Sequence, residues 1–366
     1  MKFIPTRLST LLFAFPILHA ADLPAWALGP FERPTDAQPV IRPISESRFK
    51  DPITGTSIAW EKLHTFNPAA VVHNGTIHVL YRAEDDSGDM KIGGHTSRFG
   101  LAMSEDGIHF TRRDTPVLFP AEDAQKAHEW PGGCEDPRLA THPDGGYVVT
   151  YTQWNHQDFR LGLATSKDLI HWQKQGSPFE GSAYENLRTK SAAIVHELRD
   201  GVLVASRIDG KFWMYFGERQ INIATSEDLI HWTPVVDDSG ELLVLIRPRK
   251  GKFDSALTEV GPQAVKTEQG IALIYNAKNA TDSHRDPNLT PGVYGCGQVG
   301  FDAQDPTRVI GQLDEPFFQP ELDWEKTGQY ASGTTFAEGL VYHKGRWIIY
   351  YGCADSFVGV AMSPIR

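Results

Sequence analysis

The chain has 366 residues, with 35 Lys and Arg against 46 Asp and Glu, which gives a formal net charge of −11. An acidic chain lacks the basic face that nucleic acids and anionic membranes need, so neither is expected as a partner. Aromatic residues make up 11% of the chain, and those not needed in the core are suited to stacking on the apolar faces of sugars.

The N-terminal residues 1–21 have the pattern of a secretory signal peptide. Lys2 and Arg7 are followed by an apolar run over residues 8–18 and by small residues for cleavage. The run is too short for a permanent membrane helix, so we predict a periplasmic or secreted protein. Residues 22–62, rich in Pro and Arg, are predicted to form an extension that packs on a single domain of residues 63–366.

A nine-residue segment then occurs three times, beginning at Ala102, Ala164 and Ala224, and the second and third copies are nearly identical. A period of about 60 residues is too long for helical solenoid units and suits the large blades of a propeller. Each copy contains a histidine that we assign to this structural motif, namely His109, His171 and His231.

Five pairs of apolar strands recur out of phase with this motif. Their second strands are residues 77–81, 147–151, 202–205, 271–275 and 347–351. Most turns between the strands combine Gly with Asn, Asp or Lys, which is a hairpin signal. Long helical periodicity is absent, so the predicted fold class is all-β, as a five-bladed β-propeller.

The predicted inner strands begin with polar residues that all differ, in the order Asn67, Asp136, Lys190, Glu259 and Ser332. A purely structural ring would repeat small or apolar residues, so a shared polar site at the central channel is predicted. Cleavage of a glycosidic bond needs two opposed carboxylates, and Asp136 with Glu259 is the evident pair. Glu218 is a second candidate base, although a Glu followed by Arg219 is commonly a solvated pair. Pro137 is expected to hold Asp136 extended, unless Asp-Pro only begins a turn.

The three cysteines and the histidines carry less information. Cys296 and Cys353 can form a disulfide only if neighbouring blades bring them together, and the sequence fixes no connectivity. Cys134 is expected to be a small buried residue rather than a catalytic thiolate. No histidine pair has the spacing of His-Glu-x-x-His, so we predict no metal and no cofactor.

Several motifs together resemble those of glycoside hydrolase family 130. They are Asn67-Pro68, Tyr81-Arg82-Ala83, Gly133-Cys134-Glu135-Asp136-Pro137-Arg138, the Ser-x-Asp-x-x-His-Trp copies, Gly261-Pro262 and Tyr351-Gly352-Cys353-Ala354-Asp355. The resemblance runs from about residue 60 to the C-terminus. It implies a five-bladed propeller that acts on β-mannosides with inversion, either by phosphorolysis or, in a smaller group, by hydrolysis of β-1,2-linked mannose.

The resemblance also implies roles for individual residues. Asp136 would be the proton donor, acting through the 3-hydroxyl of the mannosyl unit. The residues that would hold this mannose are Asn67, Arg82, Arg98, Arg138, Lys190 and Asp302, with Asp355 in addition. Arg82 and Arg98 have an alternative reading as ion pairs between blades.

Departures from the family pattern favour hydrolysis. Phosphorylases of the family tend to have Tyr-His-Gly after the fourth inner hairpin, whereas this chain has Ile274-Tyr275-Asn276-Ala277 and so lacks the phosphate-binding His. Glu259 and Glu218 would repel a phosphate dianion, and export also fits hydrolysis. The sequence therefore predicts an exported, inverting exo-β-mannosidase for β-1,2-linked mannosides, with Asp136 as acid and Glu259 or Glu218 as base. The alternatives are a β-mannoside phosphorylase that forms mannose 1-phosphate and a non-catalytic glycan-binding propeller; the oligomeric state is left open.

Overall fold

The structure, a computed structural model, describes residues 23–365, so the predicted signal peptide of residues 1–21 lies outside the described residues. Within that range the helical elements are the short α1 (Lys126–Glu129) and the 3-10 turn η1 (Asp323–Glu325), and the remaining regular structure is β. The predicted all-β class is confirmed. None of the helices between residues 23 and 365 has the length and apolar character needed to cross a membrane.

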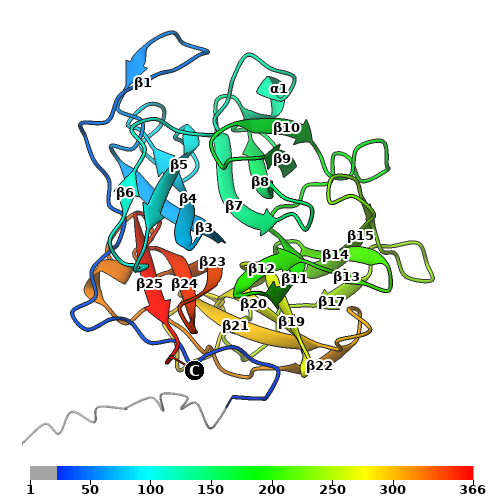
Figure 1. The fold of residues 1–366 in the computed structure, drawn as a ribbon. Coiled ribbons are helices and arrows are strands. Elements are labelled where there is room, and N and C mark those ends of the chain that lie inside the picture. Colours follow the sequence, from blue (N-terminus) through cyan, green and yellow to red (C-terminus); the bar gives the residue numbers. More distant parts are fainter. Residues whose placement is uncertain (1–22, 366) are drawn as a thin grey trace, which may run out of the picture.

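After a short hairpin of β1 (Phe49–Lys50) and β2 (Ser57–Ile58), the strands form five mainly antiparallel groups in chain order (Figure 1). The first group is β3 (His64–His73), β4 (Thr76–Glu84), β5 (Ser97–Ser104) and β6 (Thr111–Arg112). The second is β7 (Gly133–Thr141), β8 (Tyr147–Trp154), β9 (Phe159–Ser166) and β10 (Trp172–Gly176). The third is β11 (Ala192–Arg199), β12 (Val202–Ala205), β13 (Arg207–Ile208), β14 (Lys211–Phe216), β15 (Ile221–Ser226), β16 (Trp232–Pro234) and β17 (Val244–Ile246). The fourth is β18 (Leu257–Val260), β19 (Ala264–Thr267), β20 (Gly270–Lys278), β21 (Tyr294–Phe301) and β22 (Val309–Gln312), and the fifth is β23 (Thr335–His343), β24 (Arg346–Cys353) and β25 (Phe357–Met362).

The early strands of the groups contact one another in a circuit. β3 contacts both β7 and β23, β12 contacts β7 and β23, and β20 contacts β23. Two parallel pairings also link neighbouring groups, one between Ser97 and Gly133 and one between β11 and β19, so hydrogen bonding merges the groups into sheets of eight, twelve and three strands. Figure 1 shows these early strands near a common centre, with the later strands outside. Side chains from all five groups can therefore meet at the centre.

The turn residues explain the strand pairing. Asn74 and Gly75 have φ of 50° and 76°, and Lys344 and Gly345 have φ of 48° and 81°. Two successive residues with positive φ are required by the tight turn whose twist matches that of a β-hairpin. The hairpins predicted at β3–β4 and β23–β24 are confirmed by their register.

The three repeated segments, Ser-x-Asp-x-x-His followed by Phe in the first copy and by Trp in the other two, form turns after β5, β9 and β15. In the second copy, Asp168 Oδ1 accepts hydrogen bonds from the backbone N–H groups of Ile170 and His171, and Asp168 Oδ2 pairs with His171 Nδ1 at 2.7 Å. The first and third copies have the same contacts around Asp106 and Asp228. These histidines therefore serve the turns, as the sequence predicted.

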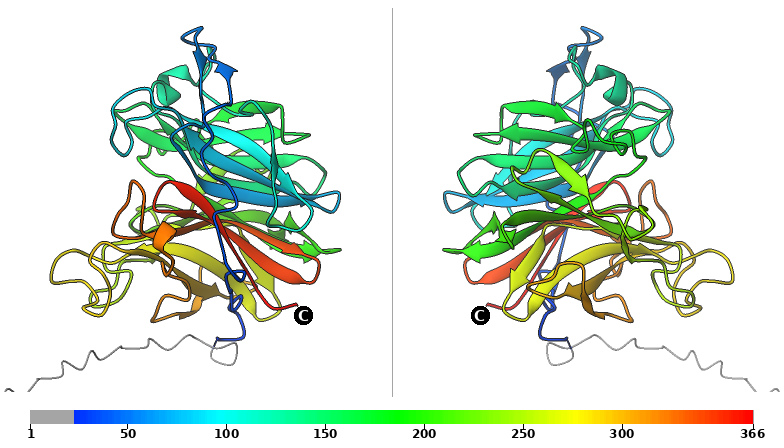
Figure 2. Two further views of the ribbon diagram at one scale, coloured as in Figure 1. Left: turned by 90° about the vertical axis from the view of Figure 1, so that its left-hand side faces the viewer. Right: turned by 90° about the vertical axis from the view of Figure 1, so that its right-hand side faces the viewer.

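The segment before β3 lies along the last strand group. Glu32 and Ile41 form isolated β-bridges with Met362 and Val358 of β25, and Figure 2 shows this dark blue segment beside the red strands. The Leu28 N–H also donates to Gln298 Oε1 of β21 at 2.8 Å. The segment thus ties the beginning of the described chain to its end.

The apolar core lies between neighbouring groups, where burial of apolar surface supplies most of the stabilisation. One cluster joins Val79 of β4 to Val341 and Tyr350 of the last group. Cys134, Cys296 and Cys353 are buried free thiols, so the conditional pairing of Cys296 with Cys353 does not occur.

Candidate active site

A pocket of about 240 Å³ is lined by residues of four strand groups and by Lys190, which lies two residues before the first strand of the third group. Its carboxylates are Glu84, Glu135, Asp136, Glu259 and Asp355, and its cations are Arg82 and Lys190. Carboxylates thus outnumber cations in the lining. A larger hollow of about 510 Å³ lies on the outside of the second group, around Trp172, but it gathers residues from only two groups.

β-Bulges at the inner ends of the strands turn polar side chains toward this pocket. The register shifts between Phe66 and Pro68 in β3 and between Glu135 and Arg138 in β7. The residues in these bulges, Asn67 and Asp136, have φ of 45° and 52°. The prediction that Pro137 holds Asp136 extended is wrong, because the bulge places Asp136 in the left-handed region despite the preference that a following proline imposes.

Asp136 is surrounded by donors. It is 3% exposed, and its Oδ1 accepts from Asn67 Nδ2 at 2.8 Å and from Arg82 Nη1 at 3.0 Å, while Lys190 Nζ lies 3.5 Å from Oδ2. Burial raises the pKa of Asp136, but the charges of Arg82, Lys190 and Arg138 outweigh burial and hold that pKa well below its usual range. Asp136 is therefore ionised in the free protein.

Its neighbour Glu135 behaves in the opposite way. Burial raises the pKa of Glu135 to about 7, although Arg82 Nη2 donates to its Oε1 at 2.7 Å. Sequence reasoning passed over Glu135, because consecutive residues of a regular strand point to opposite faces. The bulge brings both carboxylates of the Glu-Asp pair onto one guanidinium.

Lys190 lies between the predicted acid and the two candidate bases. Its Nζ is 3.2 Å from Glu259 Oε1 and 3.9 Å from Glu218 Oε2. Asp136 Oδ2 and Glu259 Oε1 both lie within 3.5 Å of this nitrogen, so the two oxygens are at most about 7 Å apart.

The two glutamates differ in their surroundings. Glu259 is 2% exposed, lines the pocket, and accepts from Ser191 Oγ at 2.6 Å. The Glu218 side chain is 22% exposed and does not line the pocket, and burial raises its pKa against the opposing charge of Lys190. The structure thus places Glu259 closer to the pocket than Glu218.

Three more predicted residues line the pocket. Asn67 donates to Asp136, and its buried Oδ1 has no hydrogen-bond partner among the described residues. Burial raises the pKa of Asp355 to about 6. Arg82 reaches the pocket, but each of its three nitrogens donates to a protein oxygen, on Ser97, Asp136, or Glu84 and Glu135. Arg82 therefore organises carboxylates.

Arg98 is not brought to the pocket. It pairs in register with Ala83, whereas Arg82 pairs with Phe99, so Arg98 faces the other side of the sheet. There its guanidinium pairs with Asp85 at 2.6 Å and with Asp51 at 2.7 Å. The alternative reading of Arg98 as an ion-pair residue fits these contacts.

Asp302 also lies elsewhere. Tyr294 lines the pocket at the first end of β21, whereas Asp302 follows the last residue of that strand. The eight residues of β21 span about 25 Å, so Asp302 is far from the pocket. Its carboxylate accepts from the backbone N–H groups of Gln304 and Asp305 and pairs with Arg308. Asp302 therefore forms a turn and does not contribute to this pocket.

Arg138 lies behind the pocket and does not line it. Its guanidinium donates to the backbone oxygens of Asp136 at 3.0 Å and Val260 at 2.6 Å, and it pairs with Glu338 Oε1 at 2.5 Å. Glu338 is 0% exposed and occupies a bulge of β23 between Ala337 and Gly339. Sequence analysis missed Glu338 and chose Ser332 as the polar residue of the fifth inner strand. The position equivalent to Asn67 and Asp136 is the bulge within β23, and not the residue before the strand begins.

Comparison with known proteins identifies the family. The model of glycoside hydrolase family 130, described as beta-1,4-mannooligosaccharide phosphorylase, matches residues 33–366. The chain belongs to glycoside hydrolase family 130 (GH130). One relative, the 1,2-beta-oligomannan phosphorylase of Thermoanaerobacter sp. (strain X514), is 33% identical over 90% of this chain and 96% of its own length.

Solved structures agree with this assignment. One solved structure is described as follows: the GH130 family of mannoside phosphorylases contains glycoside hydrolases that target β-1,2 mannosidic linkages in Candida mannan. It is 53% identical to this chain, with a TM-score of 0.92, and the match covers 94% of this chain and 96% of that chain. A glycosyl hydrolase from Bacteroides ovatus is also 53% identical, with a TM-score of 0.91 and the same coverage. The family resemblance read from the sequence motifs is therefore confirmed.

Proposed function

We propose that this GH130 protein is a five-bladed β-propeller that hydrolyses β-1,2-linked mannosides with inversion and releases mannose from the non-reducing end. Five successive strand groups whose early strands contact one another in a circuit support the propeller. A pocket of about 240 Å³ has the volume of roughly eight water molecules of ~30 Å³ each, which suits one sugar unit better than a chain.

The excess of carboxylates in the pocket is the observation that carries the choice of hydrolysis. Both lining cations already contact carboxylates, Arg82 with Asp136 and Lys190 with Glu259. A phosphate dianion would need cationic donors that are free to bind it and would be repelled by the remaining carboxylates. Water is neutral and meets neither obstacle.

The position of the missing histidine gives the same answer. Asn276 takes its place in β20, and this side chain is 0% exposed. Its Oδ1 accepts from Ala337 N at 2.8 Å and its Nδ2 donates to Ala337 O at 3.0 Å. Asn276 therefore holds β20 to β23 and does not line the pocket.

In the proposed reaction, Glu259 removes a proton from a water molecule whose oxygen attacks the anomeric carbon. The bond from that carbon to the glycosidic oxygen breaks, and the leaving oxygen takes a proton from the 3-hydroxyl of the mannosyl unit, which regains one from Asp136. Asp136 is ionised in the free protein, so it must first take up a proton. Bound sugar excludes water and separates Asp136 from Lys190, which both raise its pKa, and Glu135, with a pKa of about 7, is a nearby proton source.

Incubation with β-1,2-mannobiose, with and without inorganic phosphate, tests the proposal. We expect mannose as the product at the same rate in both conditions, and NMR should show the α-anomer first, because inversion of a β-linkage forms it. Asp136→Asn and Glu259→Gln should each lower kcat about 10²–10⁴-fold. Dependence on phosphate with formation of mannose 1-phosphate would establish phosphorolysis, and binding without turnover would establish a glycan-binding module.

Phosphorolysis remains the second candidate because of the relatives' names. The beta-1,2-mannobiose phosphorylase of Thermoanaerobacter sp. is 29% identical over 89% of this chain. Export, proposed from the leader pattern of residues 1–21, favours hydrolysis, since a sugar phosphate conserves energy only inside a cell. Fractionation of cells that express the full chain would test export directly.

A further inference from the structure

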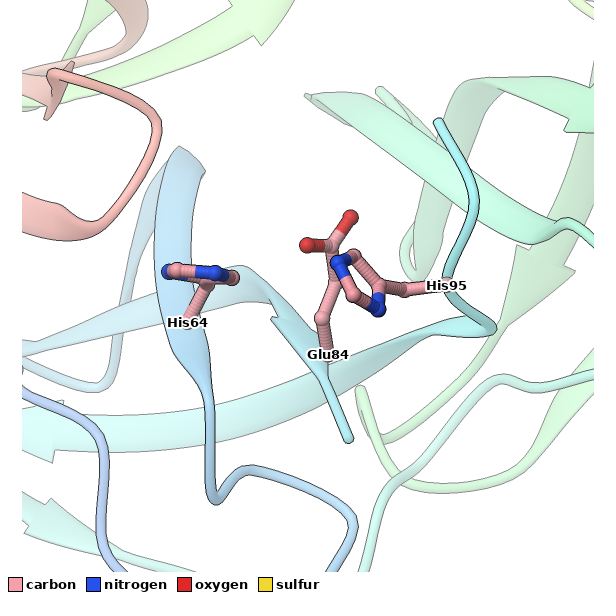
Figure 3. Close-up of side chains that lie close together, drawn as sticks. All are labelled: His64, Glu84 and His95. Carbon is pink, nitrogen blue, oxygen red and sulfur yellow. The ribbon is translucent and has the colours of Figure 1, made fainter. Parts of the chain in front are cut away.

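Three side chains of metal-binding type meet at the edge of the pocket. His64 at the start of β3, Glu84 at the end of β4 and His95 before β5 each offer one ligand atom, and these atoms lie within 4.8 Å of one another (Figure 3). His64 and Glu84 are direct cross-strand partners, and Ser97, two residues after His95, also pairs with Glu84. The sheet register assembles this cluster, which is why a search for local spacing did not find it.

Hydrogen bonds fix the orientation of both imidazole rings. His95 Nδ1 lies 3.3 Å from the backbone oxygen of Ser87, which can only accept, so Nδ1 carries the proton. His64 Nδ1 lies 3.1 Å from Ser356 Oγ, and that hydroxyl donates to Ala354 O, so it accepts from His64. No hydrogen bond among residues 23–365 uses Nε2 of either ring. A ring held through N–H by an oxygen, with the other nitrogen unprotonated, is the usual state of a metal-ligating histidine.

Glu84 also has one oxygen available. Its Oε1 accepts from Arg82 at 2.7 Å and from Ser97 at 3.2 Å, whereas its Oε2 accepts only from Gln329 Nε2, at 3.2 Å. The carboxylate is 1% exposed and lines the pocket. The positive charge of Arg82 repels a metal ion placed here. Arg82 is already paired with Glu135 and Asp136, however, so the surroundings of the cluster have an excess of negative charge.

We propose that His64, His95 and Glu84 bind one divalent transition-metal ion of the Zn²⁺ class, with the remaining coordination positions open to water or a sugar hydroxyl in the pocket. Two imidazole nitrogens and one carboxylate oxygen suit Zn²⁺ or Co²⁺, whereas Ca²⁺ and Mg²⁺ prefer oxygen ligands. Ligand atoms around a tetrahedral Zn²⁺ are about 3.3 Å apart, so the side chains must close by on the order of 1 Å. The proposed hydrolysis uses no metal, and the two proposals stand independently.

Metal titration of the chelator-treated full-length protein tests the site. We expect calorimetry to give one Zn²⁺ per chain, and Co²⁺ to give visible d–d absorption of a site with nitrogen ligands. His64→Ala and His95→Ala should each weaken Zn²⁺ binding at least 100-fold. The matched control is His78→Ala, since His78 packs on His73, with ring centroids 5.7 Å apart, and lies outside the cluster. This control should bind Zn²⁺ with the affinity of the unmodified protein.

Absence of stoichiometric binding, unchanged affinity in both cluster variants, or equal weakening in His78→Ala would overturn the proposal. Circular dichroism establishes that each variant is folded, and His64→Gln, which keeps a polar side chain beside Ser356, replaces His64→Ala if that variant unfolds. Hydrolysis of β-1,2-mannobiose by the chelator-treated protein is measured separately. Failure of the metal site therefore leaves that assay unaffected, and failure of hydrolysis leaves the titration unaffected.

Discussion

The buried pair of Arg138 and Glu338 should hold the active-site geometry together. One guanidinium joins the backbone of Asp136 in β7, the backbone of Val260 beside Glu259, and the carboxyl of Glu338 in β23. It thus connects three strand groups directly behind the proposed acid and base. Replacement by Met keeps an unbranched apolar stem and removes every one of these contacts.

The size of the expected destabilisation follows from the burial of this pair. Removing one partner of a buried ion pair costs about 3–5 kcal/mol. Burial already raises the pKa of Glu338 well above its usual range, against the charge of Arg138, so Glu338 can take up a proton when Arg138 is lost. We therefore expect the lower end, about 3 kcal/mol, for Arg138→Met at pH 7. The loss of stability in Arg138→Met should grow as the pH rises. A carboxyl whose pKa is raised in the folded state holds its proton more tightly in the folded than in the unfolded chain, so removing that proton at higher pH destabilises the fold.

Urea denaturation of a double-mutant cycle measures these energies. Arg138→Met/Glu338→Met should be about 2 kcal/mol less destabilised than the sum of the two single variants, since it leaves no unpaired charge buried. Arg199→Met, which removes an exposed pair with Glu197, should leave the midpoint unchanged. Additive single variants, or an Arg138→Met variant as stable as the control, would refute the reasoning.

Three other predictions concern charge and packing. Lys190→Met should raise the pKa of Glu218, which burial raises and Lys190 lowers, and an NMR titration of the Glu218 carboxyl in both proteins would measure the change. Burial lowers the pKa of His196 from 6.5 to about 4, so the free energy of unfolding should fall by up to about 3 kcal/mol as the pH drops from 6.5 to 4, and urea denaturation should show a smaller fall in His196→Gln. A Cβ at Gly352 would lie 2.1 Å from Asn67 Oδ1, so Gly352→Ala should displace Asn67 and lower kcat by about 100-fold in the mannobiose assay; unchanged turnover would show that the position of Asn67 is unimportant.

Much of the fold was predictable because it depends on local signals. Turn residues such as Asn74-Gly75 specify tight hairpins through their positive φ, and the repeated segment with Asp168 and His171 specifies its own turn through hydrogen bonds within four residues. Apolar strands between such turns then have few ways to pair. These signals predicted the all-β class and the positions of the hairpins.

The site was only partly predictable because its residues meet through tertiary contacts. Asn67, Lys190 and Glu259 reach the pocket as expected. Arg98 does not, since alternation along β5 places it on the other face of the sheet, and no motif records which face a strand turns inward. Glu338 was invisible because its partner, Arg138, lies in another strand group.

Four residues at or beside the pocket share an unusual backbone conformation. Asn67, Asp136, Ser191 and Asp355 all have φ between 45° and 60°, and all belong to the pocket or contact its residues. A side chain other than glycine in this region costs on the order of 1–3 kcal/mol, which regular strand residues would not incur. The surrounding ladders must supply that energy, and in return the bulges in β3 and β7 turn Asn67 and Asp136 out of the sheet and toward the centre. Strain at the inner ends of the strands is therefore the means by which this fold assembles an acidic site, and it is also why propensities, which describe unstrained strands, located the hairpins but misjudged the backbone of Asp136.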